Sequence, residues 1–121
     1  MQGERVSLGY ENSSMWIGSQ NGYKILVFEG DLDYFNAPKV DLDPFCTEDL
    51  IIDFQQVTYV DCAWVWKLVA CYKKMTENGC RLIIVKSAQG RSLVEHILTV
   101  VKFNHLFVFR TSIDSAHTSL A

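Results

Sequence analysis

One short segment in the middle of the chain combines residue types that could do chemistry. It reads DCAWVW from Asp61 to Trp66 and directly precedes a helical pattern. The Asp61 carboxylate is a good N-cap because it can accept hydrogen bonds from the free amides of a first helical turn. Such a helix start also attracts an anion or a carboxylate of a partner. We expect Asp61 both to cap the helix and to lie within a docking surface.

Cys62 is the one candidate nucleophile in this segment. A helix N-terminus favours the thiolate form of cysteine, so Cys62 could be reactive. Against this, the sequence places no histidine and no resolving cysteine beside it, and a buried, inert thiol is the more common state of a cysteine. We predict that the protein is not an enzyme and keep a redox sensor built on Cys62 as an alternative.

Two tryptophans in the same segment offer a different kind of site. The apolar residues at 65, 68, 69 and 72 predict the face of the helix that meets the core. By the 3.6-residue period, Trp64 and Trp66 each lie about 100° from this stripe, on opposite flanks. Both could pack under neighbouring loops as boundary residues. Alternatively, one is exposed and anchors a partner, because tryptophan is frequent at interface hot spots. Ala63 and Lys67 are expected to point away from the core.

Acidic residues also gather near the ends of predicted strands. Paired carboxylates can do acid–base work, but Asp31 and Asp33 stand in a turn, where we expect them to bond loop amides. The cysteines and histidines of the chain show no metal-ligand spacing. We therefore predict no metal site and no cofactor.

The helix that follows Asp61 has a clear apolar stripe. Val65, Leu68, Val69 and Tyr72 are spaced i, i+3, i+4 and i+7, which predicts one buried face. Asn78-Gly79 predicts the end of the helix.

The remaining elements alternate between strands and helices. Asn21-Gly22 predicts a hairpin turn, and residues 55–60 are expected to form a loop. Segment 34–49 is either a short helix capped by Asn36 or an irregular loop, because Pro44 would break a longer helix. Predicted strands are 15–20, 23–29, 50–54, 81–86 and 106–109, and predicted helices are 91–102 and 113–120. This order predicts an α/β fold with a mixed sheet, in which an antiparallel hairpin precedes parallel βαβ strands.

Length and charge narrow the class of protein. The 121 residues fit a single domain, 1–121, in which we assign no element to residues 1–12 and expect that they can be flexible. The net charge of −3 and the absence of a basic stripe argue against nucleic acid. The sequence lacks an apolar stretch of the ~20 residues that span a bilayer and an apolar leader. These features predict a cytoplasmic protein with free thiols that does not insert into a membrane.

Several short strings follow one another along the chain: FEGDLD (28–33), LIIDF (50–54), VTYVD (57–61), NGCRLIIV (78–85) and VKFNHLF (101–107). In this order and spacing they resemble the STAS domain of bacterial anti-sigma-factor antagonists. FEGDLD (28–33) is similar to the family's G-x-L-D, and LIIDF (50–54) with VTYVD (57–61) is similar to the strand that precedes its Asp-Ser-Ser-Gly. NGCRLIIV (78–85) and VKFNHLF (101–107) resemble later family strings. The resemblance covers residues 23–116 and implies a STAS-like sheet packed with helices.

The departures from the family pattern bear on regulation. Ala63 stands where the resemblance places a phosphorylated serine, and alanine has no hydroxyl to modify. Tryptophans replace glycines of the family at positions 64 and 66, and the first family helix is shortened within 34–49, which would change the footprint of a partner.

The resemblance implies a regulatory protein–protein interaction domain that lacks the phosphorylatable serine. The expected partner is an anti-sigma factor of the serine-kinase type. A cytoplasmic accessory subunit of a lipid-transporting ABC system, bound to the transporter ATPase, is an alternative, and a homodimer stays open. The partner-binding residues that we predict are Asp61, Cys62, Ala63, Trp64, Trp66, Lys67, Asp31 and Asp33.

Overall fold

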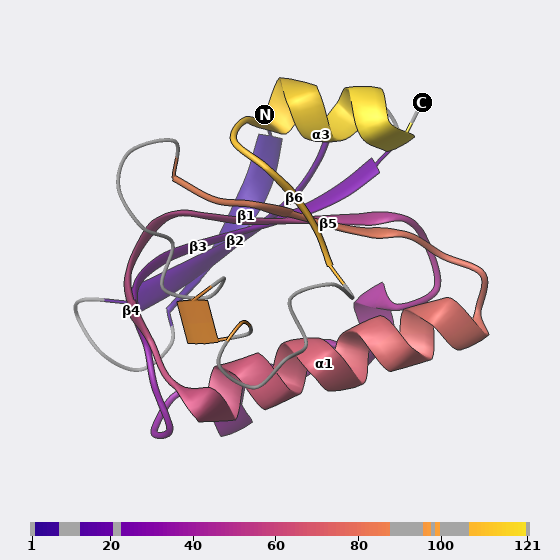
Figure 1. The fold of residues 1–121 in the computed structure, drawn as a ribbon. Coiled ribbons are helices and arrows are strands. Elements are labelled where there is room, and N and C mark those ends of the chain that lie inside the picture. Colours follow the sequence, from indigo (N-terminus) through magenta and orange to yellow (C-terminus); the bar gives the residue numbers. More distant parts are fainter. Residues whose placement is uncertain are drawn as a thin grey trace.

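A single mixed sheet organises the molecule (Figure 1). The structure, a computed structural model, describes residues 2–7, 13–20, 23–87, 96–97, 99 and 107–120. The strands follow the order β1-β2-β3-β4-β5-β6. Their bounds are β1 Gln2–Ser7, β2 Ser13–Gln20, β3 Tyr23–Leu32, β4 Leu50–Val60, β5 Leu82–Val85 and β6 Val108–Arg110.

The pairing confirms the predicted mixture of strand directions. β2 and β3 form the expected antiparallel hairpin, with Gln20 opposite Tyr23. β3, β4, β5 and β6 are parallel to one another in sequence order. β1 is an added antiparallel strand on the outer side of β2, in a polar stretch to which we had assigned no element.

The predicted loop at 55–60 is wrong, because β4 continues through it to Val60. The register between β3 and β4 shifts twice, between Val27 and Glu29 and between Gly30 and Asp31. Such irregularities bend and twist a strand without ending it. The polar residues of this stretch therefore belong to a strand that curves toward the start of the next helix.

The long helix α1 (Cys62–Glu77) begins and ends where its sequence predicts. The Asp61 side chain accepts a hydrogen bond from the Ala63 amide at 3.0 Å, so Asp61 is the N-cap. At the other end, Gly79 has φ +72°, and the Cys80 amide donates to the Met75 carbonyl at 2.8 Å. A left-handed residue closed by this hydrogen bond is a Schellman motif, for which glycine is preferred.

Segment 34–49 forms two short 3₁₀ turns, η1 (Ala37–Lys39) and η2 (Asp43–Phe45). A proline lies in the first turn of each, where its missing amide costs nothing. The predicted capping role of Asn36 is wrong, because its side chain makes no cap hydrogen bond to η1. The first helix is thus shortened, as the sequence predicts.

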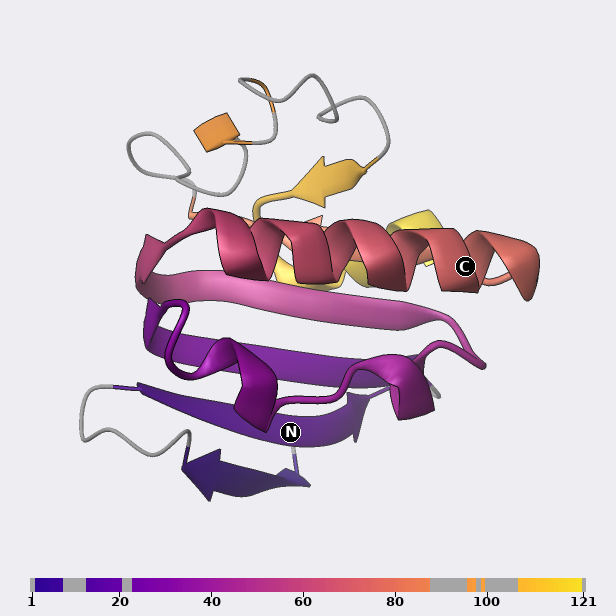
Figure 2. The ribbon, with the colours of Figure 1, turned by 90° about the horizontal axis from the view of Figure 1, so that it is seen from below.

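The two faces of the sheet carry unequal cores. α1 lies on one face and α3 (Ile113–Leu120) on the other (Figure 1). The 3₁₀ segment lies beside α1 on the same face (Figure 2). The core under α3 is small, and its buried members are Ile25, Ile51, Ile83, Val85, Ala116 and Leu120.

The C-terminal elements lie close to their predicted positions. β6 begins and ends later than the predicted strand 106–109, and α3 matches 113–120 with Ser112 accepting a hydrogen bond from the Ser115 amide at 3.0 Å. The predicted helix 91–102 lies mostly outside the described residues. In the part of the chain that is described, no helix is long and apolar enough to cross a membrane.

Candidate functional site

The ends of β3 and β4 and the start of α1 meet at one end of the molecule (Figure 2). The Asp61 amide donates to the Leu32 carbonyl at 3.1 Å, which joins the two strand ends. One Asp61 carboxylate oxygen accepts from the Ala63 amide at 3.0 Å, and the other accepts from the Tyr34 amide at 2.7 Å. A single carboxylate therefore holds both the helix start and the loop after β3.

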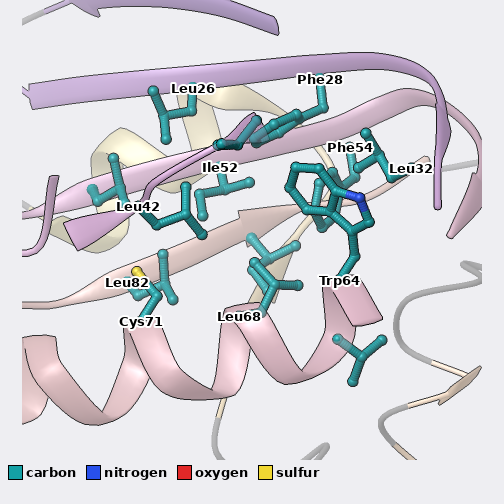
Figure 3. Close-up of a cluster of buried hydrophobic side chains, with 14 of the residues drawn as sticks. Leu26, Phe28, Leu32, Leu42, Ile52, Phe54, Trp64, Leu68, Cys71 and Leu82 are labelled. Carbon is teal, nitrogen blue, oxygen red and sulfur yellow. The ribbon is translucent and has the colours of Figure 1, made fainter. Parts of the chain in front are cut away.

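Trp64 lies in the core beside this junction and is fully buried. Its ring packs edge-on against Phe28, with ring centroids 5.1 Å apart (Figure 3). Its indole Nε1 donates to the Asn36 side-chain oxygen at 2.7 Å and to the Asp33 carbonyl at 3.1 Å. Trp64 therefore packs under the loop after β3, which is one of the two alternatives predicted for it, and it lies deeper than a boundary residue.

The buried face of α1 is turned toward Trp64 relative to the predicted stripe. Its fully buried members are Trp64, Val65, Leu68, Cys71 and Met75, whereas Val69 and Tyr72 are only partly buried. The segment with η1 and η2 covers the Trp64 flank. Trp64, Leu68, Cys71 and Met75, at i, i+4, i+7 and i+11, are themselves an apolar stripe, which the prediction from Val65, Val69 and Tyr72 overlooked.

Asn36 connects the segments around Trp64 and was missed as a site residue. It is 1% exposed. Its side-chain oxygen also accepts from the Asp33 amide at 3.0 Å, and its Nδ2 donates to the Asp31 carbonyl at 2.8 Å. Asparagine is common in turns, so the sequence carried no signal that this one is buried.

The two acidic residues at the end of β3 have different roles. Asp33 accepts from the Phe35 amide at 2.9 Å and from the Asn36 amide at 3.1 Å, which confirms the expected bonds to loop amides. Asp31 instead accepts from the Thr58 hydroxyl at 2.7 Å, across the bent part of β4.

Large aromatic side chains are exposed around this junction. Tyr34 is 70% exposed and Phe35 is 66% exposed. Their rings meet edge to face, with centroids 5.5 Å apart. Tyr59, near the end of β4, is 48% exposed, and Trp66, in the second turn of α1, is 50% exposed. We call the surface formed by Tyr34, Phe35, Tyr59, Cys62 and Trp66 the docking corner.

The remaining predicted site residues of α1 differ in exposure. Cys62 is exposed, so the common buried state of a cysteine does not apply to it. Ala63 and Lys67 are half-buried, and Ala63 packs partly against the main core. Within the described ranges, no group of three or more histidine, cysteine, aspartate or glutamate side chains could hold a metal ion. The corner offers apolar contact area on a loop whose amides are hydrogen-bonded to Asp61 and Asn36.

The comparisons with known proteins agree with this architecture. The sequence profile of the STAS domain matches residues 17–116, most of the chain. The chain belongs to the STAS-domain family. None of the curated proteins matches this STAS domain with significance.

Two solved structures share the fold of this STAS domain. An anti-sigma factor antagonist from Mycobacterium paratuberculosis superposes with a TM-score of 0.72 at 17% identity, over 88% of this chain and 92% of that one. The anti-sigma factor antagonist SpoIIAA, in its unphosphorylated form, superposes with a TM-score of 0.70 at 10% identity, over 88% of this chain and 95% of that one. At these identities the likeness concerns the fold, and the STAS domain described here resembles those antagonists in architecture.

Proposed function

We propose that this STAS domain acts in the cytoplasm as a non-enzymatic docking protein for an anti-sigma factor of the serine-kinase type, through the docking corner. The observation that carries the proposal is the set of exposed aromatic side chains on a braced junction. Aromatic residues at interfaces supply much contact area at little entropic cost, and they are frequent at hot spots.

The bracing of the corner supports this role. The Tyr34 amide is held by Asp61 at 2.7 Å, and the loop after β3 is held from below by the buried Trp64 and Asn36. A surface that is already ordered loses less entropy on binding than a mobile one. The corner can therefore present its aromatic rings without rearrangement.

Serine phosphorylation at position 63 cannot switch partner binding in this STAS domain. Ala63 has no hydroxyl, and its amide is engaged by Asp61. A relative that is switched at this position needs an acceptor oxygen there. Binding by this STAS domain is expected to be independent of phosphorylation at Ala63.

Calorimetry with purified proteins tests the proposal. The serine-kinase anti-sigma factors encoded in the same genome are titrated with the wild-type chain and with a Tyr34→Ala, Phe35→Ala double variant. One anti-sigma factor is expected to bind the wild type. The double variant should raise Kd by at least about tenfold, because each hot-spot truncation costs more than ~1 kcal/mol of binding free energy. Trp64 is left intact because it is part of the core.

The matched control is Val108→Ala on β6. Val108 is also an exposed apolar residue, at 40%, but it lies at the start of a parallel strand, away from the end where β4 enters α1. Val108→Ala should bind as the wild type does. The proposal fails if no anti-sigma factor binds, or if the double variant binds as tightly as the control. Binding of a transporter ATPase instead would establish the ABC-system alternative.

A further inference from the structure

Two cysteines that are distant in sequence touch inside the main core. Cys46 follows η2 and Cys71 lies in the middle of α1, 25 positions later, and their Sγ atoms are 3.4 Å apart. Cys46 is 0% exposed and Cys71 is 2% exposed. Disulfide sulfurs are about 2.05 Å apart, so the two atoms need to approach by only about 1.4 Å to be bonded.

The surroundings keep both groups in the thiol form in the resting protein. The Cys46 Sγ donates to the Leu42 carbonyl at 3.2 Å, and the Cys71 Sγ lies 3.8 Å from the Met75 sulfur. Figure 3 shows Cys71 pointing from α1 into the apolar layer near Leu82. Burial raises the pKa of both thiols, so neither is a thiolate while the core is closed.

The two cysteines differ in how firmly they are held. Cys71 belongs to a 16-residue helix, whereas Cys46 belongs to a segment of short 3₁₀ turns. Among the contacts that hold this segment to α1 are the exposed ion pair between Asp43 and Lys74 at 2.9 Å and a hydrogen bond from Asn78 Nδ2 to the Cys46 carbonyl at 3.0 Å. Val40 and Leu42 also anchor the segment in the core, but its backbone is held by isolated turn hydrogen bonds and not by the continuous ladder of a long helix. Such a segment opens locally at lower free-energy cost than the middle of a long helix. Local opening therefore exposes Cys46 before Cys71.

We infer that Cys46 and Cys71 are a latent disulfide pair, which a hydroperoxide closes by way of Cys46. On opening, the Cys46 thiol loses its proton to water, and the thiolate sulfur attacks one peroxide oxygen. The O–O bond breaks, leaving Cys46 sulfenic acid and hydroxide, which takes up the released proton. Before the segment has closed fully, the Cys71 thiol loses its proton to water and its thiolate attacks the Cys46 sulfur. The S–OH bond breaks, and the hydroxide that leaves takes up that proton as water. Overall, two thiols and one hydrogen peroxide give one disulfide and two waters.

The bond would join the segment with η1 and η2 covalently to α1. Cys62 is exposed and Cys80 is half-buried, and neither is paired with a second cysteine in the described part of the chain. Their oxidation therefore leads to sulfenic and higher acids or to disulfides between molecules. An intramolecular disulfide is specific to the buried pair.

Mass spectrometry of the full chain tests the inference. The Cys62→Ser, Cys80→Ser variant, which keeps only the buried pair, is treated with hydrogen peroxide, unfolded and alkylated. We expect a monomer lighter by about 2 Da, for the two hydrogens lost, that takes up no alkyl group until a reductant is added. Complete alkylation of both cysteines after oxidation, or a gain of about 16 Da without a cross-link, would overturn the inference.

A single-cysteine control separates pairing from damage. In Cys46→Ala added to the Cys62→Ser, Cys80→Ser variant, the remaining Cys71 should stay a free thiol after the same treatment, because it has lost the partner that reaches solvent. If this variant does not fold, the wild-type chain still decides the question through its peptide map. A linked pair of Cys46 and Cys71 peptides supports the inference, and a disulfide through Cys62 with both buried cysteines alkylated contradicts it.

Discussion

A single buried amide, that of Asn36, ties together the loop, the strand end and the helix that meet at the docking corner. It accepts from Trp64 Nε1 and from the Asp33 amide, and it donates to the Asp31 carbonyl. Buried polar groups are costly unless they are paired, and Asn36 is the nearer of the two acceptors of Trp64 Nε1. The exposed aromatic residues rest on this network although none of them is part of it.

Asn36→Ala should lower the free energy of unfolding by about 3 kcal/mol, because it removes three side-chain hydrogen bonds at a buried position. Chemical denaturation followed by tryptophan fluorescence measures the change. Asn78→Ala is the matched control, since Asn78 Nδ2 also donates to a backbone carbonyl, that of Cys46 at 3.0 Å, but the residue is exposed. The control should lose at most about 1 kcal/mol. Equal losses in the two variants would contradict the central place of Asn36.

Asp53 makes a second residue-scale prediction, on the α3 side of the sheet. Burial raises the pKa of its carboxyl, and hydrogen bonds from the Gln55 amide and side chain oppose this only in part. Because the pKa is raised in the folded state, the protonated carboxyl of Asp53 contributes fully to stability below the unfolded-state pKa of about 3.9. This contribution is lost as the pH rises through the folded-state pKa. At neutral pH the ionised carboxylate therefore costs stability.

Asp53→Asn should raise the free energy of unfolding at pH 7, and the gain should disappear as the pH falls to about 4. Asp49→Asn is the control of opposite sign. Partial burial tends to raise the pKa of Asp49, but the hydrogen bonds and charge of Arg81 hold this pKa below its usual value. Asp49→Asn should therefore lower the free energy of unfolding at pH 7 and have no effect in acid. Denaturation midpoints across pH 3–8 decide whether the two variants diverge in this way.

At the scale of elements, the start of α1 and the loop after β3 are stabilised together. The two oxygens of Asp61 cap the helix through Ala63 and hold the loop through Tyr34. An ordinary N-cap does only the first of these. Loss of Asp61 is therefore expected to affect the loop that carries the exposed rings as well as the helix.

Asp61→Ala should cost about 2–3 kcal/mol, the sum of a lost cap and one lost hydrogen bond, and it should speed hydrogen exchange of the Tyr34 amide. Ser112→Ala is the comparison, because Ser112 caps α3 through the Ser115 amide. It should cost about 1 kcal/mol, as a lost cap alone does. An unchanged exchange rate at Tyr34 in Asp61→Ala would show that the loop does not depend on this carboxylate.

At the scale of the molecule, three features occupy separate places. The docking corner lies where β4 passes into α1, the sulfur pair lies under the middle of α1, and α3 covers the opposite face of the sheet. The α3 helix is held at its end by Tyr23 and Arg81, which both donate to the Leu120 carbonyl, at 2.9 and 2.7 Å. Changes at the corner can therefore be made without disturbing the smaller core.

Much of this arrangement follows from local features of the sequence. The spacing of apolar residues, the cap at Asp61, the stop at Asn78-Gly79 and the alternation of strands and helices correctly predict α1, β5, α3 and the mixed sheet. Each of these signals depends on residues within a few positions of one another, so it can be read without knowing the rest of the chain. The STAS resemblance carried by the short strings agrees with the family match over residues 17–116.

The docking corner includes two residues of the segment DCAWVW, but only the tertiary structure decided the role of each residue in that segment. Trp64 is a core residue and Trp66 a half-exposed one because the segment with η1 and η2 covers one flank of α1. The helix carries two overlapping apolar stripes, one through Trp64 and Cys71 and one through Val69 and Tyr72, and its sequence leaves open which of them is covered. The burial of Asn36 and the contact between Cys46 and Cys71 also join positions far apart in sequence. Such contacts have no periodic signature, since they depend on how separate elements pack. The sequence by itself determined which residues begin the helix, and packing determined which of them a partner can reach.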